Sequence, residues 1–309
     1  MSASEPSIAV VGSLNVDYVA KVGRLPMPGE TVAASDLEIV YGGKGANQAV
    51  AAVRQECAVR MMGSVGADDI GRAYLSYLKK QGIDVSGIRQ VKGTSTGSAF
   101  ISVDAMGENT IVVTSGANGL TSPDQIRARD PFIAEADALL AQFEVPLSVV
   151  VEALRIANRA GVLSVVNPSP FRSTFPWASV EIDYLIVNEN EADEILEDLP
   201  IKLDAAVEIR EFLKGIRVNG IVVTRGSDAT LVIGPDEAFE APTLPVVPVD
   251  TVGAGDAFAG CFTARMAMGE SLRDAVLAAN CAGALTTLRS GAQAAIPDRD
   301  RVDQHRDQL

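Results

Sequence analysis

Histidine is almost absent from this sequence. The 309 residues contain one, His305, and it lies in the charged C-terminal tail. A Ser-His-Asp or Cys-His mechanism needs a histidine in the body of the fold, and histidine-rich zinc sites need several. Both kinds of chemistry are therefore excluded. Any catalysis by this chain must depend on carboxylates, backbone amides and bound cations.

Cysteine is also scarce, and the chain lacks long apolar runs. Its three cysteines, Cys57, Cys261 and Cys281, form no C-x-x-C pair, which predicts buried thiols in a reducing cytoplasm. Residues 1–7 contain no basic segment leading into an apolar run, and no stretch reaches membrane-spanning length. We therefore expect a cytoplasmic protein without a membrane partner.

Positive charge is in short supply. There are 26 Lys and Arg against 40 Asp and Glu, a formal net charge of −14. A nucleic acid or an anionic membrane requires a basic face, so neither is an expected partner. An acidic protein that binds a polyphosphate must create positive potential locally, through helix N-termini, one or two lysines and Mg²⁺.

The two common phosphate-binding signatures are missing. No G-x-x-x-x-G-K-[ST] occurs, and the glycine pair Gly253-x-Gly255 is followed by Phe258 where a dinucleotide fingerprint has its third glycine. The run that contains Lys44 fails the same test at Gln48. A polyphosphate site in this chain must be built differently.

The stretch from Val249 to Gly260 is the most informative in the chain. It combines an extended-looking segment, a glycine turn at Gly253 and an apolar run of helical length. A glycine turn that leads into a helix leaves backbone N–H groups free for an anion, and the helix dipole adds positive potential. Asp256 lies within this cradle, where we expect it to stay ionised and accept a hydrogen bond from a hydroxyl. This indicates phosphoryl transfer to an alcohol, although a tight turn into a packed helix needs the same glycines.

Strand-like and helix-like segments alternate along most of the chain. Strands are predicted at 8–12, 59–63, 138–143, 163–166, 184–187 and 220–223, and helices at 42–56, 70–81, 147–160, 189–197, 205–215, 257–268 and 272–289. This order predicts the α/β class, with a doubly wound, mostly parallel sheet and helices on both faces. Two segments, about 17–42 and 96–115, break the alternation and are predicted to form a small β-sheet lid.

Polar residues recur where the predicted strands end. They are Asn15, Glu144, Asn188 and Thr224. Each alone could be a helix cap, but together they indicate one site at the carboxyl edge of the sheet. Asp17 would face the same side as Asn15 if the chain stays extended, and a polar Asx turn is the alternative. For Lys44 the alternative is a solvated surface charge.

Several motifs along the chain match one known family. They read GSLNVD at 12–17, PGET at 28–31, GGKGANQAVAA at 42–52, NENE at 188–191, TRGS at 224–227, DTVGAGD at 250–256 and GAQ at 291–293. Together they resemble the ribokinase-like (PfkB) carbohydrate kinases, over nearly the whole chain. The motifs at 188–191 and 250–256 identify the superfamily, and the run at 42–52 is similar to its ribokinase branch.

The resemblance implies a reaction and a set of site residues. The fold would be a single ribokinase-like kinase domain over 1–309, and the reaction would be transfer of the γ-phosphoryl group of ATP to the 5-hydroxyl of D-ribose. Asp256 would be the catalytic base, and the amides of Gly253, Ala254 and Gly255 would form an anion hole. The sugar would be held by Asn15, Asp17, Gly43, Lys44, Gly45, Asn47, Glu144 and Asp256.

Nucleotide and cation sites are implied as well. The nucleotide would be bound by Asn188, Thr224, Arg225, Gly226, Ser227, Gly255 and Asn280, and Glu191 would place Mg²⁺ through water. A potassium ion would be held by Asp250, Val252, Thr286, Arg289, Gly291 and Ala295, mostly through backbone carbonyls. Two positions depart from the family pattern: Asn280 stands where histidine is frequent beside the adenine, and Ala295 where serine is common. An alternative for Asp250 is a cap or an ion pair with Arg289.

Three functions stay open from the sequence. The first is a ribose kinase, the second a sibling kinase for another sugar or nucleoside, such as deoxyribose, fructose or ketodeoxygluconate. The third is a sugar- or nucleotide-binding regulator without catalysis, against which the intact Asp256 and its glycine turn argue. Because a small sheet needs a covered face, we also expect two lids to pack together in a homodimer.

Overall fold

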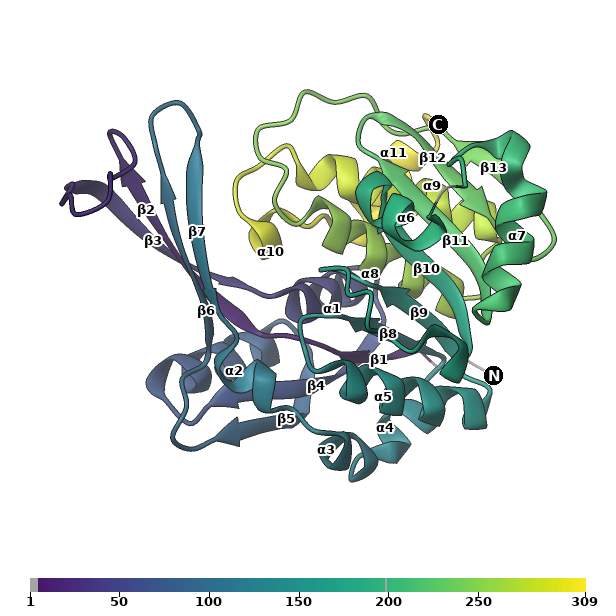
Figure 1. Ribbon diagram of the computed structural model, residues 1–309, viewed down its shortest axis with the longest axis horizontal. Coiled ribbons are helices and arrows are strands. Elements are labelled where there is room, and N and C mark those ends of the chain that lie inside the picture. Colours follow the sequence, from purple (N-terminus) through teal and green to yellow (C-terminus); the bar gives the residue numbers. More distant parts are fainter. Residues whose placement is uncertain (1–4, 198) are drawn as a thin grey trace.

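The computed structural model describes residues 5–197 and 199–309, and its largest feature is a nine-stranded sheet (Figure 1). In sheet order the strands are β13 (Ala238–Ala241), β12 (Asp228–Ile233), β11 (Val218–Arg225), β10 (Ile182–Asn188), β9 (Leu163–Asn167), β8 (Ala138–Gln142), β1 (Ser7–Val11), β4 (Ala58–Gly66) and β5 (Asp84–Val91). Strands β11 to β5 are parallel, whereas β12 and β13 are antiparallel to their neighbours. The predicted mostly parallel sheet is confirmed.

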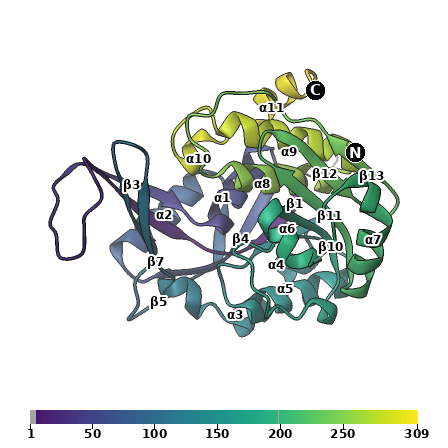
Figure 2. The ribbon, with the colours of Figure 1, turned by 45° about the horizontal axis from the view of Figure 1, so that its top comes forward.

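Two hydrophobic cores lie on opposite faces of this sheet, because consecutive strand residues point to opposite sides. In β1, Ile8 and Val10 belong to one core, and Ala9 and Val11 belong to the other. The first core is covered by α1 (Lys44–Arg54), α2 (Asp69–Lys80), α8 (Ala254–Ala267), α9 (Leu272–Thr286) and α11 (Arg299–Arg306). The second is covered by α3 (Pro123–Arg127), α4 (Asp130–Ala134), α5 (Leu147–Ala160), α6 (Glu189–Leu196) and α7 (Ala206–Gly215), as Figure 2 shows. Helices therefore cover both faces, as predicted.

Helix α8 is buried around most of its circumference, and α1 and α9 pack against it. Its residues 256–265 are buried without a break. Gly260 allows close packing on α1, since a Cβ there would lie 2.4 Å from the Cβ of Ala51. A helix buried on all sides has little freedom to shift. The packing of α8 therefore fixes the position of its N-terminus.

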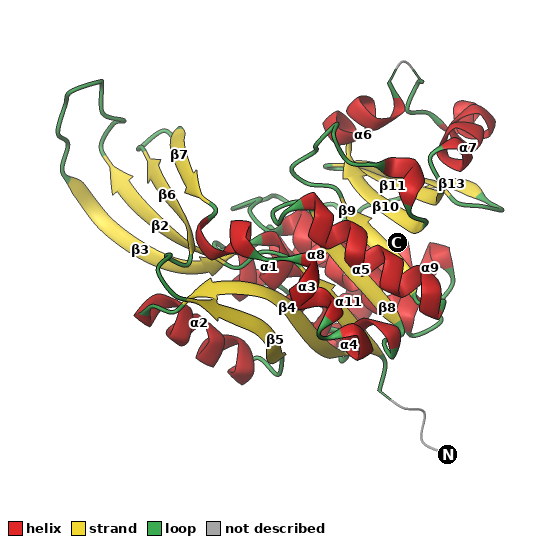
Figure 3. Cartoon of the chain, turned by 60° about the horizontal axis from the view of Figure 1, so that its bottom comes forward, coloured by secondary structure: helices red, strands yellow, loops and turns green. Residues whose placement is uncertain are grey.

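A second, four-stranded sheet forms the predicted lid and stands apart from the large sheet (Figure 3). Its order is β3 (Ala34–Gly42), β2 (Asn15–Val22), β6 (Gly97–Val103) and β7 (Asn109–Thr114). The β2–β3 and β6–β7 pairs are antiparallel, and β2–β6 is parallel. Residues 12–14 separate β1 from β2, and Gly43 separates β3 from α1. The lid therefore leaves the body of the protein beside the N-terminus of α1.

The structure corrects two expectations near the glycine turn. The helix predicted to reach Arg289 ends at Thr286, and the extended segment predicted before Gly253 forms no strand in residues 242–252. Instead, the amides of Val249 and Asp250 both donate to the carbonyl of Thr287, at 2.8 and 3.1 Å. That carbonyl lies at the C-terminal end of α9, where backbone acceptors are unpaired.

The remaining short elements are η1 (Gly116–Leu120), η2 (Trp177–Ser179), η3 (Leu203–Ala205) and α10 (Ala292–Ala295). All three cysteines are buried and unpaired, as predicted. Burial raises the pKa of the Cys57 and Cys261 thiols to about 12 and that of Cys281 to about 11, which makes them poor nucleophiles. Within residues 5–197 and 199–309, no helix is both long enough and apolar enough to cross a bilayer.

Candidate active site

Asp256 lies in the first turn of α8, and two amide side chains from α1 hold its carboxylate. Asn47 Nδ2 donates to Oδ2 at 2.8 Å, and Gln48 Nε2 donates to Oδ1 at 3.0 Å. Burial raises the pKa of Asp256, whereas the charge of Lys44 and the two amides lower it. The expectation that the helix N-terminus alone keeps this carboxylate ionised is therefore incomplete. Asp256 is a desolvated base whose charged form depends on its α1 neighbours.

The turn before Asp256 requires glycine at position 253. Gly253 caps α8 with φ 82°, and a Cβ there would lie 2.9 Å from the Cα of Ala292. The Ala254 amide donates to the carbonyl of Thr251 at 3.3 Å. Within the described residues, no protein acceptor pairs with the amides of Gly253 and Gly255. These two N–H groups are available to an anion at the helix N-terminus.

Carboxylates and a lysine from three different segments gather beside Asp256. Glu144, directly after β8, accepts from the Ser13 hydroxyl at 2.5 Å and from the Lys44 amide at 3.0 Å. Burial, together with the charge of Glu144, raises the pKa of Asp17 to about 6. Glu144 also acts to raise the pKa of Asp256. The structure thus brings together four residues that the sequence predicted to form one site: Asp17, Lys44, Glu144 and Asp256.

Asn15 is held by a residue that sequence analysis missed. Asn118, in η1, accepts from the Leu14 amide at 2.9 Å and donates to Asn15 Oδ1 at 2.8 Å. This arrangement leaves the Nδ2 group of Asn15 as the available donor. No sequence pattern marked Asn118, because it lies 103 residues away from Asn15 and follows the lid strand β7.

The glycine run at 42–45 lets two loops approach at backbone distance. A Cβ on Gly43 would lie 2.6 Å from the Asn15 amide nitrogen, and one on Gly45 would lie 2.6 Å from the amide nitrogen of Ser13. Gly43 also has φ 91°, which favours glycine. The helix predicted from residue 42 therefore begins at Lys44, and its first turn faces the polar ends of β1 and β8.

Asn188 and Thr224, both predicted nucleotide residues, are register partners at the ends of β10 and β11. Asn188 and Glu191 form a capping box on α6, in which Asn188 Oδ1 accepts from the Glu191 amide and Glu191 Oε2 accepts from the Asn188 amide. The cap that the sequence left as an alternative for Asn188 is thus present. One carboxylate oxygen of Glu191 stays outside this pair of bonds.

The other predicted nucleotide residues have structural partners. Arg225 donates to the Ala229 carbonyl at 2.6 Å and to Glu240 at 2.7 Å. Asn280 accepts from the Thr230 hydroxyl at 2.7 Å and donates to the Pro242 carbonyl at 2.9 Å. In the turn between β11 and β12, Gly226 has φ 60° and the Ser227 carbonyl accepts from the Thr243 hydroxyl at 2.6 Å.

Asp250 joins the two loops that contain most of the predicted potassium residues. Its Oδ1 accepts from the Val252 amide and its Oδ2 from the Gly291 amide, each at 3.0 Å. Within the described residues Asp250 forms no ion pair with Arg289, whose side chain is exposed. The Thr286 hydroxyl donates to the Ala282 carbonyl within α9 at 2.7 Å. Ala295 lies in α10.

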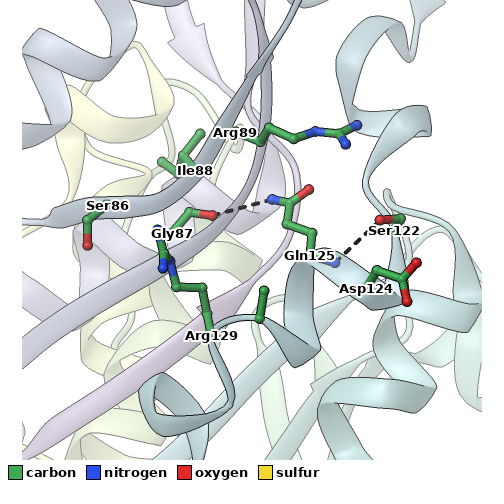
Figure 4. Close-up of a pocket in the computed structure, with 9 residues that line it drawn as sticks. Ser86, Gly87, Ile88, Arg89, Ser122, Asp124, Gln125 and Arg129 are labelled. Atoms are coloured by element: carbon green, nitrogen blue, oxygen red, sulfur yellow. Dashed lines mark hydrogen bonds between the residues drawn. The ribbon is translucent and has the colours of Figure 1, made fainter.

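A separate cavity of about 510 Å³ lies between β5 and α3 (Figure 4). Its lining residues are Ser86, Gly87, Ile88, Arg89, Ser122, Asp124, Gln125, Ala128 and Arg129. The Gln125 NH₂ group donates to the carbonyls of Gly63 and Gly87, at 2.5 and 3.3 Å, so both of its protons are already hydrogen-bonded within the protein. None of the predicted site residues lines this cavity, and its volume alone does not mark a reaction site.

The chain is similar to several known proteins. A sequence profile described as pfkB family carbohydrate kinase matches residues 5–299. The ribokinase of Haemophilus influenzae is 35% identical over 297 residues, which cover 96% of this chain and 97% of that protein. The deoxyribokinase of Salmonella typhimurium is 32% identical over 302 residues, covering 96% and 98%. The structure of Arabidopsis thaliana ribokinase complexed with ribose and ATP superposes with a TM-score of 0.89 at 27% identity, covering 98% of this chain and 99% of that one.

The family profile spans nearly the whole chain, and it includes every element that contributes to the Asp256 site. The sequence match to the Haemophilus influenzae protein is equally continuous, since it covers 96% of the chain. The chain therefore belongs to the pfkB family of carbohydrate kinases.

Proposed function

We propose that this protein transfers the γ-phosphoryl group of ATP to the 5-hydroxyl of D-ribose, giving D-ribose 5-phosphate and ADP. The observation that carries the proposal is the placement of Asp256. Its buried carboxylate lies at a helix N-terminus whose Gly253 and Gly255 amides have no protein acceptor in the described chain. The carboxylates of Asp17 and Glu144 lie nearby and could bind sugar hydroxyls.

In the proposed mechanism Asp256 accepts the proton of the 5-hydroxyl. As that oxygen bonds to the γ-phosphorus, the bond from phosphorus to the β,γ-bridging oxygen breaks and ADP leaves. In a loose transition state the proton departs late, so positioning matters more than basicity. The Gly253 and Gly255 amides, with that of Ala254, would stabilise the charge on the transferring group.

The sugar is proposed to lie between α1 and the lid strand β2. In the described chain no protein donor reaches the Asp17 carboxylate. Asn15 uses its Oδ1 to accept from Asn118, so its Nδ2 group remains available as a donor. These groups suit sugar hydroxyls, which both donate and accept. Lys44, Asn47, Glu144 and the backbone of Gly43 and Gly45 complete the proposed sugar site.

ATP is proposed to extend from the α8 N-terminus toward the ends of β10 and β11, past Asn188, Thr224 to Ser227 and Asn280. Residues 5–197 and 199–309 contain no group of three or more acidic, histidine or cysteine side chains placed to hold a metal. This fits Mg²⁺, which is usually held by one or two carboxylates, waters and the substrate phosphates. Glu191 would hold it through water, and the ion would neutralise phosphate charge.

The proposal is tested by ADP release over a panel of sugars. We expect D-ribose to give the highest kcat/KM. A preference for fructose or ketodeoxygluconate would move the function to a sibling kinase. ADP release that no sugar or nucleoside stimulates would support the non-catalytic regulator instead.

Ribose should exceed 2-deoxyribose in kcat/KM by at least about tenfold, because a site that pairs a hydroxyl rejects an analogue without it. The similarity to a deoxyribokinase makes this the sharpest comparison among sugars. Asn15→Asp is the matched variant. It keeps the oxygen that accepts from Asn118 but replaces the Nδ2 donor. We therefore expect it to reduce the preference for ribose over 2-deoxyribose. Equal kcat/KM values in the wild type would contradict the prediction.

A potassium ion is proposed to stabilise the two loops joined by Asp250. Within the described residues, no donor reaches the carbonyls of Asp250, Val252 and Arg289. Unpaired carbonyls with one carboxylate suit a hard cation, and the carbonyls of Thr286, Gly291 and Ala295 would complete the set. The ion would steady the turn that ends at Gly253 without touching substrate.

Replacing potassium by tetramethylammonium, and then by sodium, at constant ionic strength should lower activity several-fold, mostly in kcat. Asp250→Ala should be insensitive to the exchange. Arg289→Ala should keep the response, because the proposed ligand there is a carbonyl rather than the side chain. Unchanged wild-type activity without potassium would show that no potassium ion stabilises these loops.

We also propose a cytoplasmic homodimer of 1–309 kinase units, formed through the lid segments 17–42 and 96–115. One row across the lid joins Ile39, Tyr18, Phe100 and Val112 as successive register partners. Ile39, Phe100 and Val112 are 64%, 52% and 63% exposed. Light scattering should show a dimer that Phe100→Glu dissociates, whereas Val207→Lys, at an exposed position on α7, should not. A monomeric wild type would defeat this prediction.

A further inference from the structure

A chain of four hydrogen bonds leads from the lid to Asp256. Tyr74, on α2, donates from its hydroxyl to the carbonyl of Gly42, the last residue of β3, at 2.6 Å. Gln293 Nε2 donates to the Tyr74 hydroxyl oxygen at 2.8 Å and to Asn47 Oδ1 at 2.9 Å. Asn47 Nδ2 then donates to Asp256 Oδ2 at 2.8 Å. Tyr74 and Gln293 have no part in the function proposed above.

The direction of this chain follows from its starting point. A backbone carbonyl only accepts, so the single proton of Tyr74 is directed to Gly42 and its oxygen is left as an acceptor. The Gln293 amide must therefore turn its NH₂ group toward Tyr74. The same NH₂ group meets Asn47, whose oxygen faces Gln293 and whose NH₂ group faces Asp256. The carbonyl of Gly42 thus determines which end of Asn47 meets the base.

The reversed direction would have the opposite effect on Asp256. If Gln293 turned its oxygen toward Tyr74 and Asn47, the Asn47 amide would rotate and present Oδ1 to Asp256 Oδ2. Two acceptors would then face each other in a buried site, which is stable only if the carboxyl group carries a proton. The observed direction therefore favours a deprotonated Asp256.

The burial of the chain supports a functional role. Gln293 is 2% exposed, and its Oε1 is buried without a hydrogen-bond partner in the described part of the chain. A buried amide oxygen without a partner is unfavourable, because it has lost its hydrogen bonds to water. An apolar side chain would avoid that cost, and the Gln293 NH₂ group is the part of the amide that forms hydrogen bonds. Tyr74 is fully buried, and burial raises its pKa well above the ordinary value, so its hydroxyl keeps its proton.

A similar pair of amides reaches the other carboxylate oxygen. Gln142 Nε2 donates to Gln48 Oε1 at 2.6 Å, and Gln48 Nε2 donates to Asp256 Oδ1 at 3.0 Å. Gln142 Oε1 is likewise buried and unpartnered among the described residues. Because two relays act on Asp256, the loss of one should weaken the base without abolishing it.

We propose that Tyr74 and Gln293 are positioning residues for phosphoryl transfer, which orient Asn47 so that its NH₂ group faces Asp256. This rests on the proposed function of Asp256 as the base. The charged groups that face Asp256 are Lys44 on α1 and Glu144 after β8, and substitutions at 74 and 293 leave both in place.

The test uses Tyr74→Phe and Gln293→Met, each of which removes one link. Loss of the oriented N–H donor should raise the pKa of Asp256, by about one unit, which corresponds to a tenfold change in equilibrium. The acidic limb of kcat/KM against pH should move up, so each variant loses about tenfold at low pH and much less at high pH. The pKa is also measured without substrate, from the carboxyl ¹³C shift of Asp256 during titration, assigned with Asp256→Asn.

Two controls separate positioning from stability. Tyr77→Phe removes a half-buried hydroxyl from α2, the helix that carries Tyr74, but this hydroxyl takes no part in the four hydrogen bonds. Gln55→Met removes a buried amide that accepts from Arg265, at the other end of α1. Both should keep the wild-type pH profile even where they lower the melting temperature.

The possible results are distinct. An unchanged ¹³C titration in both variants, or an equal loss of activity at every pH, would overturn the positioning role. If one variant fails to fold, the other still decides. A wild type that does not phosphorylate ribose would overturn the proposed function, while the titration would still test the orientation of Asn47.

Discussion

Asp256→Asn should lower kcat by a factor of ~10² or more while leaving the fold and nucleotide binding in place. The carboxylate is the acid side chain at the α8 N-terminus, and an amide there cannot accept the proton of the sugar hydroxyl. The new side chain would also place its NH₂ group against the N–H donor of either Asn47 or Gln48, since these donate to different oxygens of Asp256. We therefore expect a small loss of stability beside the large loss of turnover, measured by steady-state kinetics, nucleotide titration and thermal melting.

Asp183→Asn is the matched control for this variant. Asp183 accepts from the amide and the hydroxyl of Ser164, both at 2.8 Å, near the start of β10 and far from its carboxyl end. Its loss should lower the melting temperature with little change in kcat. Near wild-type turnover in Asp256→Asn would remove Asp256 from the mechanism.

The second large effect should come from Gly253→Ala, with kcat lowered by roughly 10²-fold, the scale of losing one anion-hole donor. A Cβ at this position would lie 2.9 Å from both the Cα and the Cβ of Ala292. The turn must move to relieve the contact, and its movement displaces the amides that would face the transferring phosphoryl group. The positive φ of 82° adds backbone strain of about 1–2 kcal/mol.

Gly269→Ala is the control that adds backbone strain without displacing the amides at the N-terminus of α8. Gly269 follows the other end of α8 with φ 79°, and a Cβ there would meet nothing within 4 Å. It should lose similar stability and keep its kcat. If Gly253→Ala proves as active as Gly269→Ala, the glycine turn serves only the backbone, which is the alternative that the sequence left open.

The fold was largely predictable, because alternating strands and helices leave a strong pattern. The lid was recognisable as an interruption of that pattern, and β6 and β7 both lie within the predicted lid segment 96–115. The edges of the sheet were harder to predict. The C-terminal end of α9 and the short strands β12 and β13 depend on contacts such as those of Thr287 and Asn280 with distant loops.

The site was predictable where its residues belong to local motifs. Asp256, Lys44 and Asn47 lie next to glycine turns, and polar residues at strand ends mark the edge of a parallel sheet. Asn118 and Gln293 could not be found in this way, since each is a lone amide whose partners lie far away in sequence. The rise in the pKa of Asp256 could not be predicted from the sequence either, because its main cause is burial.

The most direct test of the account is to identify the product. The wild-type protein is incubated with ATP, Mg²⁺, K⁺ and ¹³C-labelled D-ribose, and the sugar is followed by ¹³C and ³¹P NMR. We expect one phosphate monoester whose phosphorus couples to C5, formed in equal amount to ADP and roughly a hundredfold or more slowly with Asp256→Asn. A phosphoryl group on another carbon, or inorganic phosphate without a sugar ester, would contradict it.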